Sequence, residues 1–357
     1  MFFVHPQIKL NKFKKVNLAQ KLESYFPGKQ LIFTDMGRSA FKIIIEKLNL
    51  QNSEILMPAY LCDIFKPILE RYNIKPIFLD IDLTTFHIKI DEMERKITPN
   101  TKAVLVCHTY GLLFDIDKLQ KWGLPVIEDC AHAFGIKLKS DIAFFSLYKQ
   151  LPVLRGGLLV CPKDWQIGEL PKTSFSFRDF LSLLNCFSLF AFFFKKFGGE
   201  IAPKIVRKEK LSSPAGLNNV SLALFSRSLE NFEKTLENRK KMALLLQEEL
   251  RKLGFEAQKS DNSVFCYLSA LVPKSLVGKR DEIVQKLSKN GIFCTRIWHT
   301  PIILNKEVQE EYKINLADFP NTVEAAQRII NFPLQNHYKE KDIPKIINSI
   351  RKVINQL

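Results

Sequence analysis

The sequence lacks the patterns that mark several large classes of protein. It has no C-x-x-C pair and no cluster of histidine with cysteine, so we predict no metal site. It has no zinc-finger spacing and no RNA-binding aromatic motif, and its basic residues are spread along the chain. We therefore expect no nucleic-acid partner, although the formal net charge is +16. That charge fits either a lysine-rich solvated surface or a site for anionic small molecules.

The cysteines do not form a recognisable disulfide framework. There are seven, an odd number, and most lie in apolar stretches far apart along the chain. This is typical of reduced, buried thiols. Residues 1–15 have neither a long apolar core nor a small-residue cleavage site, which argues against a signal peptide. Together these features predict a cytoplasmic protein.

The chain also lacks a long, uninterrupted apolar run. The strongest candidate, Phe180 to Phe194, is too short and too interrupted for a transmembrane helix. We favour a buried helix or a subunit contact for it. Peripheral contact with a membrane through an interfacial helix is the alternative.

Short apolar segments alternate with helical segments through the first half of the chain. The expected strands are 54–57, 75–79, 102–107, 125–129, 142–145 and 157–160, and the expected helices between them are 40–50, 64–72, 91–97 and 116–122. This alternation predicts an α/β fold with a mostly parallel sheet covered by helices on both faces. We expect residues 1–35 to be an irregular lead-in and 165–215 to be a variable hydrophobic insertion.

The second half of the chain has a different pattern. A long charged segment over 220–253 predicts a helix, and strand-like pieces at 264–267 and 292–294 alternate with helices at 279–290 and 343–354. A chain of 357 residues is long enough for two domains. We predict a large α/β domain over 1–220 and a connecting helix with a small α+β domain over 221–357.

Two polar positions follow a predicted strand at 125–129. Asp129 ends the strand, and His132 comes shortly after it. In parallel sheets, ligands collect at the carboxyl ends of the strands. A carboxylate there could keep the nitrogen of a pyridine-ring cofactor protonated, so that the ring acts as an electron sink. The alternative is an aspartate that only caps the next turn.

A lysine follows the next strand. Lys149 lies between Ser146 and Gly156-Gly157. It could form a Schiff base if burial or nearby positive charge keeps its amine neutral, and Ser146 could donate a hydrogen bond to a phosphate. Lysine and arginine make up 53 of the 357 residues, so a loop lysine alone is weak evidence. Gly37-Arg38-Ser39 opens a predicted helix, and a glycine turn there could expose backbone N–H groups to an anion.

Several segments, in order, resemble the DegT–StrS family of pyridoxal-phosphate sugar aminotransferases, which share the aspartate-aminotransferase (fold type I) architecture. The resemblance covers nearly the whole chain. The matching segments are EILMPAY (54–60), KPIFLDID (75–82), ITPNTKA (97–103), HTYG (108–111), PVIEDCAHAFG (125–135), the helix over 221–250 and INFPLQNH (330–337). The resemblance implies a seven-stranded sheet, a pyridoxal 5'-phosphate cofactor and a homodimer with a shared active site.

The resemblance also implies roles for individual residues. Asp129 would hold the pyridine nitrogen, His132 would lie beside the ring, Lys149 would form the Schiff base, and Ser146 would bind the phosphate. Further cofactor contacts would come from Gly37, Arg38, Ser39, Cys62 and Asn218. Candidates for the substrate pocket are Tyr60, Arg155, Arg296, Trp298 and His299.

The chain departs from the family pattern at four places. Lys149 follows Ser146 by three residues rather than five, which indicates a two-residue deletion and a rearranged strand end. Arg38 stands in place of threonine, and Cys62 stands where an aromatic side chain normally stacks on the ring. The segment that the partner subunit supplies in the family is reduced to 217–220.

These observations predict an aminotransferase that moves an amino group from a donor such as glutamate to a nucleotide-linked keto-sugar. Its product would serve surface polysaccharide or secondary-metabolite synthesis. One alternative is a sugar dehydratase that uses the same cofactor. Another is a non-catalytic relative that acts as a scaffold or sensor.

Overall fold

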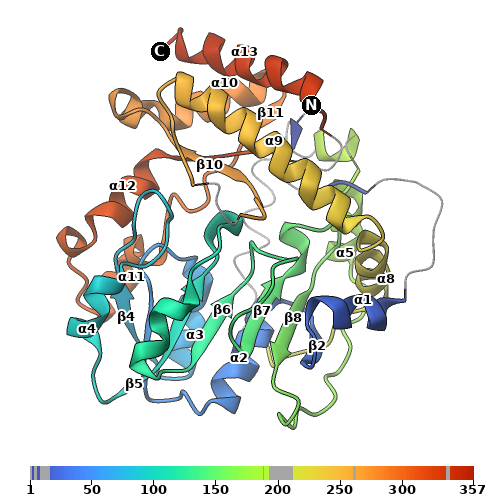
Figure 1. The fold of residues 1–357 in the computed structure, drawn as a ribbon, viewed down its shortest axis with the longest axis vertical. Helices are drawn as coiled ribbons and strands as arrows, with labels where there is room; N and C mark the ends of the chain where they lie inside the picture. The colour runs from blue at the N-terminus through green and yellow to red at the C-terminus, as the bar shows by residue number, and fades with distance from the viewer. Residues whose placement is uncertain are drawn as a thin grey trace.

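The computed structural model describes residues 2–3, 6–8, 17–187, 189–192, 212–259, 263–334 and 338–357. Figure 1 shows a large α/β unit below a smaller unit, and both ends of the chain lie in the smaller unit. The long helix α9 (Phe232–Lys252) runs from the large unit up along the small one.

The large unit is built on a seven-stranded sheet, with the strand order β2-β8-β7-β6-β5-β3-β4. All neighbouring pairs are parallel except those that β8 makes with β2 and β7. The α/β fold with a mostly parallel sheet is therefore confirmed. Its strands are β2 (Gln30–Thr34), β3 (Glu54–Pro58), β4 (Lys75–Leu79), β5 (Thr101–Cys107), β6 (Val126–Asp129), β7 (Ile142–Ser146) and β8 (Gly157–Cys161).

Helices cover both faces of this sheet because its strands are apolar on both sides. In β3, Ile55 and Met57 pack into one core cluster and Leu56 into another, as the two-residue period of a strand requires. The helices of the large unit are α1 (Leu18–Tyr25), α2 (Gly37–Lys47), α3 (Lys66–Arg71), α4 (Met93–Lys96), α5 (Phe177–Asn185), α8 (Asn219–Ser228) and α11 (Lys306–Glu311).

The small unit holds a three-stranded antiparallel sheet, with the order β12-β10-β9, and a short parallel pair of β1 with β11. Helices α9, α10 and α13 pack around one apolar cluster with these strands. Its remaining elements are β1 (Phe2–Phe3), β9 (Glu256–Ala257), β10 (Leu268–Leu271), β11 (Ile292–Phe293), β12 (Ile329–Phe332), α10 (Arg280–Lys289), α12 (Pro320–Arg328) and α13 (Ile343–Ile354).

The expectation of an irregular lead-in over 1–35 is wrong. This stretch contains β1, α1 and β2, and β2 completes one edge of the large sheet by pairing with β8. The pairing joins residues more than a hundred positions apart, so no local sequence pattern predicts it. Phe2 lies in the core of the small unit, whereas α1 and β2 belong to the large one.

Two expectations in the second half also need correction. The segment 220–253 is two helices rather than one, because the chain turns at Leu229, which is fully buried, before Asn231 starts α9. The strand expected at 264–267 is absent. Val264 and Cys266 instead donate backbone hydrogen bonds to the turn at Tyr110 and Gly111, and Phe265 has a positive φ of 44°. The strand begins only at Leu268.

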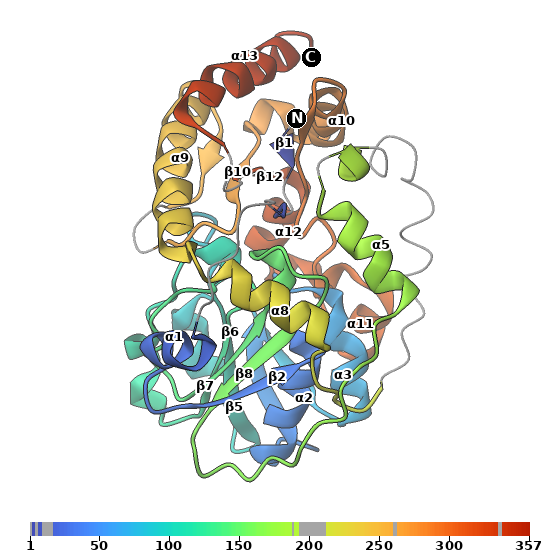
Figure 2. The ribbon, with the colours of Figure 1, turned by 90° about the vertical axis from the view of Figure 1, so that its right-hand side faces the viewer.

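The hydrophobic insertion contributes α5, which begins at a capping box formed by Ser176 and Asp179. Figure 2 shows α5 running along one side of the molecule beside α8. Phe177 and Phe180 are exposed on it, by 74% and 43%. Residues 188, 193 and 194 of the predicted apolar run lie outside the described residues. Within the described ranges, no helix has both the length and the apolar character needed to cross a bilayer.

Candidate active site

Three predicted site residues meet at the carboxyl ends of β6 and β7. Asp129 is the last residue of β6, and His132 lies in the turn that follows. Lys149 ends a single 3-10 turn, Leu147–Lys149, directly after β7. Because β6 and β7 are parallel neighbours, both loops leave the same edge of the sheet. Lys149 Nζ lies 3.2 Å from His132 Nε2.

Asp129 is a buried carboxylate with unused hydrogen-bonding capacity. Its Oδ1 accepts from the backbone N–H of Ala131 at 2.9 Å, and among the described residues its Oδ2 accepts only from the thiol of Cys107, with Sγ at 3.7 Å. Burial raises the pKa of Asp129, and the positive charge of Lys149 opposes that rise. A carboxylate oxygen accepts two strong hydrogen bonds, so Oδ2 could receive a further N–H donor.

His132 lies in a cluster of aromatic rings with Tyr110 and Trp298. Its ring lies 5.9 Å from that of Tyr110 and 5.3 Å from that of Trp298, nearly parallel to both. Its Nδ1 accepts a hydrogen bond from the backbone N–H of Tyr110 at 3.3 Å. Burial holds the pKa of His132 well below its ordinary value, and the charge of Lys149 adds to the effect, so the ring is neutral.

Opposing effects act on Lys149. Burial favours the neutral amine, but the negative charges of Tyr148, Cys62, Asp129 and Cys266 outweigh it, so the pKa of Lys149 is raised above its ordinary value. Burial in turn raises the pKa of both thiols, so at neutral pH they are uncharged. Asp129 is then the main source of attraction for the ammonium.

The amino end of α2 and the end of β7 lie side by side. A Cβ built on Gly37 would stand 3.0 Å from the carbonyl oxygen of Phe145 and 3.6 Å from Cβ of Ser146. Ser39 is buried in the first turn of α2, and Arg38 is partly exposed beside it. The structure therefore brings the predicted turn of 37–39 next to Ser146. Backbone N–H groups at a helix start together with a hydroxyl form a suitable setting for a phosphate.

Two residues that follow β3 also belong to this region. Burial raises the pKa of the Cys62 thiol, and the positive charge of Lys149 opposes that rise. The thiol therefore lies close enough to the lysine to interact with its charge. Tyr60 is fully buried, and its hydroxyl bonds with the Tyr110 hydroxyl at 2.7 Å. It also accepts from the backbone N–H of Trp298 at 3.1 Å. Tyr60 therefore anchors Trp298 against His132.

The other predicted residues are engaged elsewhere. Arg155 donates from Nε to Asp179 Oδ1 at 2.6 Å and from Nη2 to Ser176 Oγ at 3.1 Å. Arg296 pairs with Asp281 at 2.8 Å. His299 is exposed, and its Nδ1 lies 2.9 Å from the carbonyl oxygen of Arg296.

Asn218 caps α8. Its Oδ1 accepts from the backbone N–H of Ser221 at 2.8 Å. Its buried Nδ2 has no partner within the described part of the chain. The structure thus gives Asn218 a local structural role and leaves one donor atom for a ligand or a water.

Sequence reasoning assigned no role to three residues that shape the site. Tyr110 contacts His132 and Tyr60, although HTYG was noted as a motif. Cys266 lies with Sγ 3.8 Å from the carbonyl oxygen of Lys149, and Arg239 of α9 donates to that of Gln150 at 3.3 Å. Only the HTYG motif could have pointed to any of them, since Cys266 and Arg239 reach the loop from distant parts of the chain.

A second polar cluster lies at the ends of the neighbouring strands β5 and β6. His108, Glu128 and Cys130 come close enough to share a metal ion. However, His108 Nδ1 accepts from the backbone N–H of Phe114 at 3.0 Å, so its proton is on Nε2, which donates to Glu128 at 2.7 Å. Neither ring nitrogen keeps a lone pair for a metal. The cluster is a structural bridge between β5 and β6.

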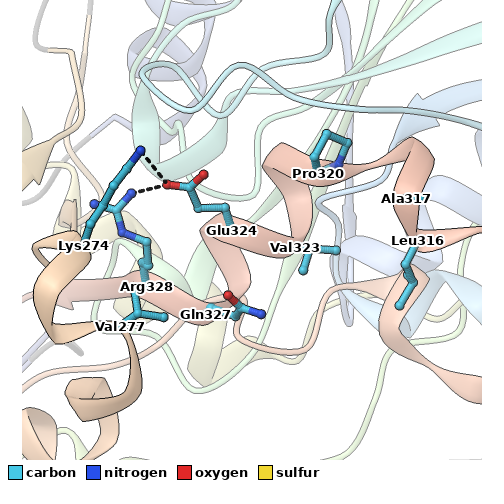
Figure 3. Close-up of a pocket in the computed structure, with 9 residues that line it drawn as sticks. All are labelled: Lys274, Val277, Leu316, Ala317, Pro320, Val323, Glu324, Gln327 and Arg328. Carbon is cyan, nitrogen blue, oxygen red and sulfur yellow. Dashed lines mark hydrogen bonds and ion pairs between the residues drawn. The ribbon is translucent and has the colours of Figure 1, made fainter.

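Two surface cavities of the structure lie away from this chemistry. One of about 580 Å³ lies along α12, and Figure 3 shows Lys274 and Arg328 on its wall, both paired with Glu324. It is lined by Lys274, Val277, Leu316, Ala317, Pro320, Val323, Glu324, Gln327 and Arg328. A second, of about 520 Å³, lies between α3 and α11. Neither includes Lys149, His132 or Asp129, so side-chain chemistry rather than cavity size marks the candidate site.

Comparison with known proteins agrees with this geometry. A sequence profile of the DegT/DnrJ/EryC1/StrS aminotransferase family matches residues 10–351. The chain belongs to this family. The expected family is therefore confirmed, and the match extends over both units.

Curated relatives include sugar-modifying enzymes. The chain is 24% identical to the dTDP-4-amino-4,6-dideoxy-D-glucose transaminase of Shigella dysenteriae, over 94% of this chain and 89% of that protein. It is 23% identical to the GDP-perosamine synthase of Vibrio cholerae, over 89% and 85% of the two chains. Among solved structures, NtdA of Bacillus subtilis with bound cofactor PMP superposes with a TM-score of 0.71 at 21% identity, over 95% and 77% of the chains. This likeness shows that the fold is shared.

Proposed function

We propose that this protein is a pyridoxal-phosphate-dependent aminotransferase acting on a nucleotide-linked keto-sugar. The observation that carries the proposal is the convergence of Lys149 and His132, at 3.2 Å, beside the buried carboxylate of Asp129. Membership of an aminotransferase family, and relatives named for GDP- and dTDP-linked sugars, support the substrate class. The net charge of +16 is compatible with an acceptor that carries a diphosphate.

The residues present fit the cofactor. Within the part of the chain that the structure describes, Asp129 Oδ2 has only a weak thiol contact, so it can accept the N–H of a protonated pyridine ring. At the other end of the site, the start of α2 and Ser146 offer backbone and hydroxyl donors for a phosphate. Gly37 matters here, because a side chain on it would meet the end of β7.

Pyridoxal phosphate, when bound, supplies an aldehyde and an electron-withdrawing ring that stabilises charge on the carbon next to the nitrogen. The protein supplies the rest. Asp129 keeps the ring nitrogen protonated. Lys149, as an amine, would accept the proton from the substrate α-carbon and return it to the carbon on the other side of the nitrogen. His132 and Trp298 form an aromatic wall that limits water access.

The amino donor and acceptor complete the proposal. Glutamate is the proposed donor, and Trp298 offers a flat surface against which a sugar or a base could pack. Arg155 and Arg296 already have carboxylate partners, so each would have to exchange that partner to contact substrate. We also propose a homodimer, which light scattering of the purified protein would test.

The test of the proposal is spectroscopic. Purified protein given pyridoxal phosphate should show a visible absorbance band that glutamate alters, and Lys149→Ala should lose the covalently formed band. Thr101→Ser, an alteration in β5 outside this site, serves as the control. Protein that stays colourless with excess cofactor would overturn the proposal. Deoxygenation of a sugar without nitrogen transfer would instead favour the dehydratase alternative.

A further inference from the structure

Cys107 of β5 lies directly opposite Asp129 of β6. The two are register partners in this parallel pair, and just beyond them the backbone N–H of His108 donates to the carbonyl of Asp129 at 3.1 Å. Ile127, two residues before Asp129, packs with Cys107 and Leu105 in one apolar cluster. Because side chains alternate between the faces of a sheet, Asp129 and Cys107 project from the same face. The sheet itself therefore fixes the thiol beside the carboxylate.

The thiol of Cys107 donates to that carboxylate. Its Sγ lies 3.7 Å from Oδ2 of Asp129. Burial and the negative charge of Asp129 hold the pKa of Cys107 well above its ordinary value, so the sulfur keeps its proton at neutral pH. An ionised carboxylate can only accept a hydrogen bond. Within the described part of the chain Oδ2 has no other donor, whereas Oδ1 accepts from the backbone N–H of Ala131 at 2.9 Å.

Other titratable groups act on Asp129 through their charge. The pKa of Lys149 is raised, so this residue is an ammonium in the cofactor-free protein, and its charge favours the carboxylate. A protonated His108 would act in the same direction. Cys62 after β3 and Cys130 after β6 also lie nearby, but burial raises the pKa of both thiols and keeps them uncharged. These groups affect how readily Asp129 ionises, and the thiol of Cys107 contacts its Oδ2 directly.

The kind of donor at Oδ2 determines how strong an acceptor this oxygen remains. A hydroxyl or amide donor stabilises a carboxylate strongly and thereby lowers its affinity for a proton. A thiol is a weak donor. It gives the buried oxygen a partner and takes little of its proton affinity. The oxygen can also accept a second hydrogen bond beside the thiol.

We propose that Cys107 is a positioning residue for Asp129: its thiol holds Oδ2 by a weak hydrogen bond, so that most of the proton affinity of this oxygen remains for the ring nitrogen of the cofactor. The clause about the ring nitrogen rests on the proposed function. The hydrogen bond and its effect on Asp129 concern the protein alone. They can therefore be measured without cofactor.

The first experiment compares donors at position 107. In cofactor-free protein labelled at the aspartate carboxyl carbons, the ¹³C signal of Asp129, assigned with Asp129→Asn, is followed across pH. Cys107→Ser should weaken proton binding to Asp129 about tenfold, because a hydroxyl bonds to a charged group more strongly than a thiol does. Cys107→Val has no donor and should strengthen proton binding about threefold. Equal values in the three proteins, or changes in the same direction in both variants, would overturn the proposal.

Cys161→Ser is the matched control. Cys161 is also a buried thiol at the end of a strand, but its Sγ faces two neutral oxygens of Gln30, at 3.9 Å and 3.7 Å. This variant should leave the titration of Asp129 unchanged. A change as large as that in Cys107→Ser would contradict the proposal. If Cys107→Val lowers the melting temperature, Cys107→Ala removes the donor without adding volume.

The second experiment observes the thiol directly. The infrared difference spectrum between the unaltered protein and Cys107→Val isolates the S–H stretching band of Cys107. This band should lie below the frequency of a thiol that makes no hydrogen bond. In the Asp129→Ala background the same band should move to higher frequency. A band that Asp129→Ala does not move would overturn the proposal.

The cofactor-loaded protein tests the clause about the ring nitrogen. Cys107→Ser should bind pyridoxal phosphate about threefold more weakly, because Oδ2 becomes a poorer acceptor, and Cys161→Ser should bind it normally. Unchanged binding in Cys107→Ser would overturn this clause. A protein that forms no visible band in any variant would sink the proposed function, and the order of proton affinities would still decide the role of Cys107.

Discussion

The ion pair of Arg155 with Asp179 gives the sharpest test of which predicted residues serve the site and which hold the fold. Sequence reasoning assigned Arg155 to the substrate pocket, but its guanidinium is bound to Asp179 and Ser176 at the start of α5. The side chains of the pair are only 15% and 2% exposed. Asp179 also accepts from the backbone N–H of Ser176 at 2.8 Å to close the capping box.

The expected cost of Asp179→Ala follows from these contacts. Removing one partner of a buried ion pair costs about 3–5 kcal/mol, because the other charge stays buried without compensation. Loss of the cap would add about 1 kcal/mol, although it overlaps with the first effect. We expect a total near 4 kcal/mol. In the double variant Arg155→Met/Asp179→Ala no unpaired charge remains, and we expect it to recover about half of that loss.

The assay is thermal unfolding of the variants side by side, with Asp141→Ala as the control. Asp141 pairs with Lys29 on the surface, where its side chain is 73% exposed, so its loss should cost less than about 1 kcal/mol. The reasoning would be refuted if Asp179→Ala and Asp141→Ala had the same melting temperature and Arg155→Met raised KM for the sugar. That result would make Arg155 a substrate residue.

Two further predictions concern the backbone and the pH dependence of stability. Gly111 has a φ of +90°, and a Cβ on it would lie 2.8 Å from the backbone N atoms of Phe265 and Cys266, so Gly111→Ala should lower the urea midpoint clearly. Gly123→Ala, at a φ of +62° with nothing within 4 Å, should cost only about 1 kcal/mol, and equal losses would contradict the argument. Burial lowers the pKa of His87 to about 4, below its value in the unfolded chain. The neutral ring therefore contributes fully to the free energy of unfolding above about pH 6.5, and this contribution falls by about 3 kcal/mol as the pH drops to about 4. Urea unfolding at pH 7 and pH 4.5 should show a smaller difference in His87→Gln, which keeps a donor for the Leu112 carbonyl but cannot titrate in this range.

The helices and strands with a clear local pattern of apolar residues were predicted correctly from the sequence. Strands β3 to β8 are short apolar runs ended by turn residues, and each lies within one or two residues of its expected position. The helix at 343–354 matches because its apolar residues repeat with helical spacing over three turns. Asp129 ends one of these strands and Lys149 follows another after one turn, which is why the sequence could predict that the two residues leave the same edge of the sheet.

The predictions that were wrong share one physical cause, which is contact between distant parts of the chain. Strand β2 is an edge strand whose partner, β8, comes much later in the sequence. The segment 264–267 has the composition of a strand, yet its N–H groups bond to the turn at Tyr110 and Gly111. The partner of Arg155 is Asp179 on α5, just before the apolar run at Phe180 to Phe194, and no local pattern pairs the two residues. In each case, contacts with distant residues determine a conformation or a partner that local propensity alone does not predict.

Contacts between distant residues also fix the short turn before Lys149. Strand β7 continues through Ser146, which pairs with Gly157, and the N–H of Leu147 then bonds to the carbonyl of Gly156 at 2.9 Å. One 3-10 turn suffices to carry the chain from there to Lys149. A tight turn of three residues keeps the lysine near the strand end, where the aromatic group around His132 can reach it. The turn is held in place by Arg239, through the carbonyl of Gln150. A deletion before Lys149, as the family resemblance predicts, would therefore leave the amine near Asp129, because the contacts around the turn fix the position of the lysine.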